Sequence, residues 1–250
     1  PGQITAHFGG ATATTLLQTT AGGHFPDDGA WHHLALTLGE APNGTRAALY
    51  IDGLLVREET VPGLVFGTAD ATVAARTDGS GDHLIGALDA LAIHTRALSP
   101  LEIASRFFRA APIGSDRTAL VHHWRFDGDF SDDKTGNPEP APNGAPSFAA
   151  GTLDQAVFFS ADGSDVPLTA DLFDNPVSAF GLSLWLKLEE PLVGDNSTIY
   201  IFGNTTQNSG GIDLLITDHP DGARLVFRTE RASGSENLAS AFGAFPDDQR

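Results

Sequence analysis

Residues 31–38 read Trp-His-His-Leu-Ala-Leu-Thr-Leu, and this stretch decides the fold class. Its leucines, Leu34, Leu36 and Leu38, recur at every second position, which places them on one face of a β-strand. Residues 47–56 also have a strand pattern, with Asp52-Gly53 inside it, and Asp-Gly is a strong signal for a turn. The pattern predicts an antiparallel β protein.

The same pattern continues along the chain. A hairpin is expected from residues 212–217 and 223–229, which a turn rich in Pro, Asp and Gly separates. One helix is predicted over 99–109, because Ser99 and Pro100 form a typical helix start. Further strands are expected at 47–56, 83–95, 120–126, 155–159, 182–188 and 198–202. Many short strands separated by turns favour an all-β, antiparallel two-sheet sandwich with one short helix.

The composition limits the classes of function. The chain has 250 residues, a net charge of −18, no cysteine and no methionine. Such an acidic chain repels phosphate backbones, which argues against a nucleic-acid partner, and no apolar run is long enough for membrane insertion. The lack of both sulfur residues suits an extracellular or cell-surface protein exposed to oxidants. The missing initiator Met indicates a mature product or an internal segment of a longer protein.

A repeat within the chain is its most informative feature. Phe25-Pro26-Asp27-Asp28 recurs as Phe245-Pro246-Asp247-Asp248, at an offset of 220 residues. A polar strand, a turn rich in Gly, Ser and Thr, and a leucine-containing segment precede each copy. Segments 1–30 and 221–250 are therefore interpreted as duplicates.

Taken in order, the motifs resemble the laminin-G-like, concanavalin A-like jelly-roll family in its bacterial tandem form. Motifs of the family's late strands are matched by Trp-His-His-Leu (31–34), Leu-Tyr-Ile-Asp-Gly (49–53), Gly-Ala-Leu-Asp-Ala-Leu (86–91) and Leu-Ser-Pro-Leu-Glu-Ile (98–103). Motifs of its early strands are matched by Val-His-His-Trp-Arg-Phe-Asp-Gly (121–128), Gln-Ala-Val-Phe-Phe (155–159) and Ser-Leu-Trp-Leu (183–186). The resemblance implies a concanavalin A-like jelly-roll sandwich.

The order of the halves departs from the family pattern. Residues 1–110 resemble the late-strand half of one module, 111–118 a linker, and 119–250 the early-strand part of the next module. A half-sandwich leaves strand edges and an apolar face uncovered. The halves can pair with each other as in a circular permutant, or neighbouring copies can complete them in a head-to-tail filament. The duplicated segments would then compete for one place in the sheet.

Adjacent histidines occur twice on predicted strands, as His32-His33 and His122-His123. Neighbouring strand residues point to opposite faces, so one metal ion cannot bind both members of a pair. Each pair is interpreted as one buried and one exposed position. The resemblance implies that the family buries the positions of all three tryptophans, Trp31, Trp124 and Trp185.

The acidic residues offer little for catalysis. A concanavalin A-like glycoside hydrolase would need two acids on one strand, roughly 5–9 Å apart. The late strands contain Asp52, which belongs to a turn, and Asp89, which is expected to accept backbone or hydroxyl hydrogen bonds. We therefore predict a protein that is not an enzyme, with glycoside hydrolysis as an alternative.

Calcium (Ca²⁺) is the candidate cofactor, because several loop oxygens can surround it, and an acidic, solvated loop without a metal ion is the alternative. One acidic loop supplies Asp127 and Asp129, without the pattern of an EF-hand. The resemblance implies a second possible site at the rim of the sandwich, which requires both halves to be assembled. Its candidate ligands are Asp78 and Asp82 from one half and Asn204 and Asn208 from the other.

These observations predict a non-enzymatic, extracellular adhesion and binding repeat of a multi-domain surface protein, with a glycan or protein ligand. The alternative is a structural subunit of a filament of neighbouring copies, joined head to tail.

Overall fold

The computed structural model describes residues 4–10, 13–19, 28–61, 71–75, 82–108, 118–136, 141–160, 164–168, 177–189, 198–203, 211–217, 224–231 and 234–239. Within these residues the chain forms sixteen strands and one helix. In chain order they are β1 (Ile4–Gly10), β2 (Ala13–Thr19), β3 (His32–Ala41), β4 (Gly44–Ile51), β5 (Leu54–Val61), β6 (Ala71–Val73), β7 (Gly86–His94), α1 (Pro100–Phe107), β8 (Leu120–Trp124), β9 (Ser147–Ala150), β10 (Gln155–Phe159), β11 (Val166–Leu168), β12 (Phe180–Leu188), β13 (Thr198–Gly203), β14 (Gly211–Thr217), β15 (Arg224–Arg231) and β16 (Gly234–Ala239).

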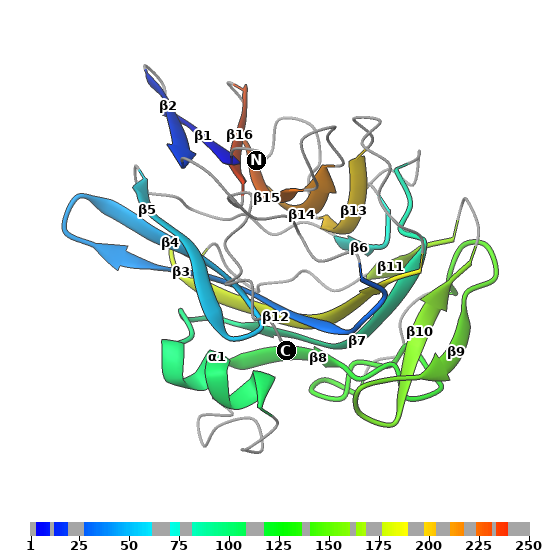
Figure 1. Cartoon of the computed structure of the whole chain (residues 1–250). Helices are drawn as coiled ribbons and strands as arrows, with labels where there is room; N and C mark the ends of the chain where they lie inside the picture. Colours follow the sequence, from blue (N-terminus) through cyan, green and yellow to red (C-terminus); the bar gives the residue numbers. More distant parts are fainter. Residues whose placement is uncertain are drawn as a thin grey trace, which may run out of the picture.

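An eight-stranded sheet forms one layer of the sandwich (Figure 1). Its strand order is β5-β4-β3-β12-β7-β10-β9, and β8 pairs with the part of β7 that β10 leaves unpaired. Strand β12 lies between β3 and β7, with Ser183 opposite Ala35 on one side and opposite Ala92 on the other. Strands from the two halves of the sequence thus alternate within one sheet.

A six-stranded sheet forms the other layer, in the order β11-β6-β13-β14-β15-β16. Strand β6 comes from the first half of the sequence and lies between β11 and β13 from the second half. Strands β1 and β2 pair with each other in a separate two-stranded sheet. The predicted all-β, antiparallel two-sheet sandwich with one short helix is confirmed.

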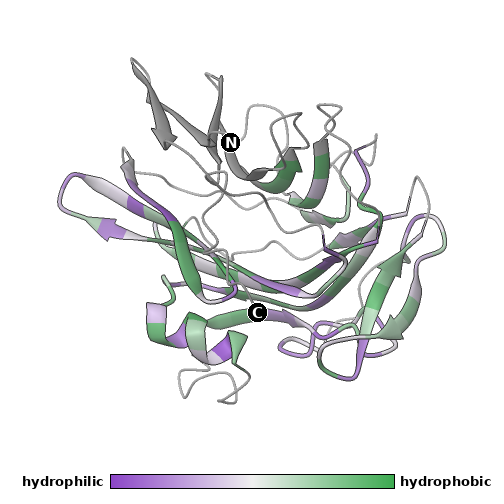
Figure 2. Cartoon of the chain, in the orientation of Figure 1, coloured by the Kyte–Doolittle hydropathy of each residue, from purple (hydrophilic) through white to green (hydrophobic). Residues whose placement is uncertain are grey.

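The main core contains apolar side chains from both halves of the sequence. Leu34, Leu36 and Leu38 are completely buried, as the alternation in β3 predicts. They belong to the same cluster as Trp124 and Phe159 from the second half. Figure 2 shows the apolar residues of this core along the strands of the large sheet. Because the strands of both halves pair within one chain, the arrangement corresponds to the circular-permutant alternative; the proposed half-module boundaries stay a prediction.

Helix α1 begins at the predicted signal and ends at Phe107, two residues before the predicted end. The Ser99 hydroxyl accepts a hydrogen bond from Glu102 N, and the Glu102 carboxylate accepts one from Ser99 N at 2.8 Å. This reciprocal pair satisfies backbone groups that the first turn of a helix leaves free. Arg96 binds the same carboxylate and, with Ser99, holds the pKa of Glu102 at about 2.

The predicted turn between β4 and β5 is also present. Asp52 and Gly53 both have positive φ, 51° and 78°, which is the backbone that a two-residue hairpin turn requires. A Cβ atom on Gly53 would lie 3.3 Å from the Phe107 ring. The turn therefore packs closely under α1.

Candidate functional site

The first histidine pair is fixed by the carboxylate of Asp52. Nδ1 of His32 lies 2.7 Å from Asp52 Oδ2, and the backbone N–H of His33 donates to Asp52 Oδ1 at 2.8 Å. Nε2 of His32 lies 3.1 Å from Asp28 Oδ1. Burial alone would lower the pKa of His32, but the hydrogen bonds with both carboxylates outweigh it and raise this pKa.

The second histidine pair has the same arrangement around Asp132. Nδ1 of His122 lies 2.8 Å from Asp132 Oδ2, and the backbone N–H of His123 donates to Asp132 Oδ1 at 2.9 Å. Lys134 N and the Thr135 hydroxyl also donate to this carboxylate, each at 2.9 Å. Asp132 is completely buried, which would raise its pKa, yet the hydrogen bonds lower that pKa to about 2. Both histidine pairs therefore have a structural role that binds a strand to a turn.

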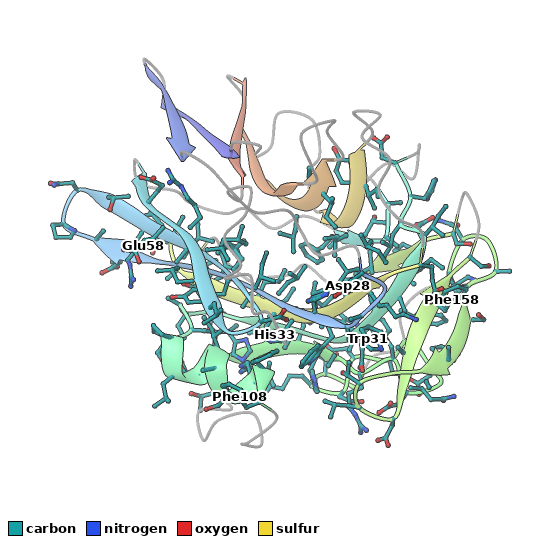
Figure 3. All side chains as sticks on the ribbon, viewed as in Figure 1. Asp28, Trp31, His33, Glu58, Phe108 and Phe158 are labelled. Atoms are coloured by element: carbon teal, nitrogen blue, oxygen red, sulfur yellow. The ribbon has the colours of Figure 1, made fainter. Side chains whose placement is uncertain are left out.

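The expectation of one buried and one exposed histidine in each pair is wrong. His32 and His33 are both buried, and His122 is buried beside a partly buried His123. The reason for the first pair is that α1 covers the outer face of the eight-stranded sheet. There the His33 ring, labelled in Figure 3, packs edge-on against Trp185, and 5.3 Å separates the two ring centroids.

A layer of basic and aromatic side chains lies between α1 and the sheet. Nη2 of Arg106 is 2.9 Å from Nε2 of His94, and the Phe107 ring stacks on Trp185. Burial, and next the charge of Arg106, lower the pKa of His33 to about 4 and that of His94 to about 3. Both imidazoles are therefore neutral at pH 7. The sequence did not reveal this layer, because only the docking of α1 brings Arg106 to the sheet.

Asp89 ties the two halves together from the middle of β7. Its Oδ2 accepts hydrogen bonds from Thr152 N at 2.7 Å, the Thr152 hydroxyl at 2.7 Å and Leu153 N at 3.0 Å. The predicted role as an acceptor of backbone and hydroxyl hydrogen bonds is confirmed. Asp89 is only 1% exposed, and burial raises its pKa. A carboxylate enclosed in this way is not open to a substrate.

Two of the six candidate calcium ligands lie in the acidic loop after β8. Asp127 accepts a hydrogen bond from Gln155 N at 2.9 Å and pairs with Arg125. Asp129 accepts one from Ser131 N at 2.9 Å. These carboxylates therefore also help to hold the loop in place. Within the described residues, no group of three or more acidic, His or Cys side chains is arranged to hold a metal ion.

The rim site can be followed only in part. Asp82 is exposed, and its carbonyl oxygen accepts a hydrogen bond from Tyr200 N in β13 at 2.9 Å. This contact brings a loop of the first half to the strand that leads toward Asn204. The other three candidates, Asp78, Asn204 and Asn208, lie outside the described residues. Calcium binding at either place stays a prediction.

The tryptophans follow the expectation from the resemblance in two of three cases. Trp124 is fully buried and Trp185 is 7% exposed. Trp31, just before β3, is only partly buried. The exposed aromatic side chain of α1 is Phe108 at its C-terminal end, 70% exposed (Figure 3).

No helix in the described part of the chain is both long and apolar enough to cross a membrane.

Comparison with known proteins gives one match. Residues 1–104 match a laminin G family model, described as the concanavalin A-like lectin/glucanases superfamily. This range holds the late-strand motifs and the two strands, β3 and β7, that flank β12. No curated protein and no solved structure gives a significant match. Residues 1–104 are therefore similar to the concanavalin A-like lectin/glucanases superfamily, and the antiparallel two-sheet sandwich is consistent with that fold.

Proposed function

We propose that this chain is a non-enzymatic adhesion and binding repeat of an extracellular or cell-surface protein, with a glycan or a protein as ligand. The superfamily includes lectins by its description, and a net charge of −18 keeps a secreted repeat soluble. Because a fold does not dictate a function, the proposal rests on the chemistry of the individual acids.

The main support for the proposal is that the carboxylates of Asp52 and Asp89 are already engaged in hydrogen bonds within the fold. Asp52 binds a histidine and a backbone N–H with its two oxygens, and Asp89 is enclosed by the turn at 152–153. A retaining or inverting glycosidase needs two carboxyl groups that flank a sugar bond in an open site. The two late-strand acids therefore serve the fold, which supports binding without catalysis.

Hydrolysis is tested by incubating the protein with a panel of β-glucans. We expect no reducing sugar from the unchanged protein, from Asp89→Asn or from Asp129→Asn, an exposed control in another loop. Release of sugar that Asp89→Asn abolishes and Asp129→Asn leaves intact would contradict the proposal. Binding is tested in parallel on immobilised glycans and extracellular-matrix proteins, and saturable binding to one class identifies the ligand.

We also propose that a calcium ion binds at the rim beside Asp82. The hydrogen bond between Asp82 and Tyr200 supports this place, because it joins the loop that holds Asp82 to β13, the strand that leads toward Asn204. Calcium that binds only the folded state adds about 2.7 kcal/mol to the free energy of unfolding when its concentration is a hundred times its Kd. We therefore expect calcium to raise the thermal midpoint.

The measurement compares thermal midpoints in millimolar calcium and in chelator. Asp82→Asn should remove the rise, whereas Asp129→Asn should retain it; the reverse result would place the ion in the acidic loop. An unchanged midpoint for the unaltered protein would remove calcium from the proposal.

The filament stays an alternative proposal for the same chain. It requires strand pairs between copies, whereas β3, β12 and β7 pair here within one chain. Light scattering after size-exclusion chromatography distinguishes a single-chain repeat from a filament, because a uniform particle of 26.2 kDa would exclude the filament.

A further inference from the structure

Two hairpins of this chain share one design. In both β1–β2 and β15–β16, two residues separate the last paired positions, Gly10 from Ala13 and Arg231 from Gly234. The second strand ends six positions before the repeated Phe-Pro-Asp-Asp in each case, at Thr19 and at Ala239. The repeat thus extends over a complete hairpin and its connection, which makes β1–β2 the structural counterpart of β15–β16.

In the sandwich, the β15–β16 hairpin occupies the edge of β14. Strand β15 pairs with β14 over its whole length, from Gly211 opposite Glu230 to Thr217 opposite Arg224. Strands β1 and β2 pair only with each other within the described residues, and β1 lies against β16, next to this place (Figure 1). The chain therefore carries two matching hairpins and a single β14 edge.

We propose that the edge of β14 is a docking site for either hairpin, and that β1–β2 and β15–β16 exchange there. Strand addition is held mainly by backbone hydrogen bonds, so an edge accepts different sequences that have a suitable strand pattern. Aligning the hairpins by their two-residue loops places His7 where Arg228 stands, opposite Asp213. This inference is independent of the proposed binding function.

The length of the connections favours exchange within one molecule. Six residues, 218–223, join β14 to β15, and twelve residues, 20–31, join β2 to β3. Tethers of this length give an effective concentration on the order of 1 mM, so a second copy at micromolar concentration occupies the edge about a thousandfold less often. The competing occupant of the β14 edge is therefore the chain's own β1–β2 hairpin.

Proline substitutions in the full-length chain test whether the hairpins can replace each other. Proline interrupts a strand ladder, so Val226→Pro disables β15 and Thr5→Pro disables β1. We expect each single variant to retain one cooperative unfolding transition near the original midpoint. The double variant should lose that transition or show a large fall in midpoint. A Val226→Pro protein as unstable as the double variant would overturn the proposal.

Disulfide trapping identifies the occupant directly, because the chain has no cysteine of its own. Asp213→Cys with Arg228→Cys reports β15 on the edge, and Asp213→Cys with His7→Cys reports β1. The second pair should give an intramolecular link that becomes the main product when Val226→Pro is added. Failure of that link to form, even with Val226→Pro, would overturn the proposal.

A mixing experiment distinguishes the chain's own hairpin from that of a second copy. One protein carries His7→Cys alone and the other Asp213→Cys alone, so a mixed disulfide between them can form only between molecules. We expect no such dimer at micromolar concentration. A dimer that forms as readily as the intramolecular link would overturn exchange within one chain.

Discussion

Replacement of Asp132 by alanine is expected to lower the free energy of unfolding by about 4 kcal/mol, because several buried donors lose their acceptor and each costs about 1–3 kcal/mol. Its carboxylate is completely buried and accepts hydrogen bonds from His123 N, Lys134 N and the Thr135 hydroxyl, beside Nδ1 of His122. Alanine would leave buried donors without an acceptor, which costs far more than the loss of an exposed bond. Urea denaturation at pH 7 measures the change.

Asp129 provides the matched control, because it lies in the same loop but is exposed. Asp129→Ala removes the bond from Ser131 N and is expected to cost less than about 1 kcal/mol. Equal losses for Asp129→Ala and Asp132→Ala would show that the buried network does not hold β8 to its turn.

Acidification from pH 6.5 to pH 4 is expected to destabilise the protein strongly through the layer beneath α1. The pKa of His33 is lowered to about 4 and that of His94 to about 3, from an ordinary value of 6.5. Below pH 6.5 these two histidines bind protons in the unfolded chain but stay neutral in the folded chain. The free energy of unfolding therefore falls as the pH falls. Each histidine contributes on the order of 3 kcal/mol by pH 4.

The raised pKa of His32 acts in the opposite direction. Its contribution is complete below pH 6.5 and is lost as the pH rises through the pKa of the folded state, so it does not weaken the protein in acid. Urea denaturation at several pH values between 7 and 4 separates the two effects.

The substitution His94→Gln removes one of the two buried imidazoles and so measures its share of the acid effect. The amide oxygen can accept from Arg106 and does not titrate, so the loss of stability between pH 6.5 and pH 4 should shrink by about half. A variant with the same loss as the unaltered protein would show that protonation of His94 does not contribute to it.

The strands that could be predicted from the sequence are those with a clear alternation. Strands β3, β10 and β12 bury alternate leucine, valine and phenylalanine side chains in the main core, and the predicted ranges match closely. Strands β6 and β11 have three residues each, and β11 contains Pro167. Elements this short are defined by their partners across the sheet, and no local pattern marks them.

In the candidate site, too, features set by nearby sequence could be predicted, whereas contacts between distant segments could not. The roles of Asp52 and Asp89 followed from their motif positions. The turn at Asp52 is a local feature, whereas the partner of Asp89, Thr152, is distant in sequence and was not predicted. Asp132 was hidden within an acidic run, although each histidine pair is followed by an aspartate that binds it. The contact between Arg106 and His94 depends on how α1 packs, which the sequence leaves open.

In this structure a strand of the second half of the sequence, β12, lies between two strands of the first half, β3 and β7, in the same molecule. Ala87 on β7 stands opposite Lys187 on β12, and directly opposed residues have Cβ atoms within disulfide reach. The most direct measurement is oxidation of Ala87→Cys/Lys187→Cys at high dilution, followed by mass spectrometry. Ala87→Cys/Arg46→Cys is the control, because β4 is three strands away from β7. We expect an intramolecular link at the monomer mass for the first pair and none for the control. A first pair that stays reduced, or that links only separate molecules, would contradict this strand order.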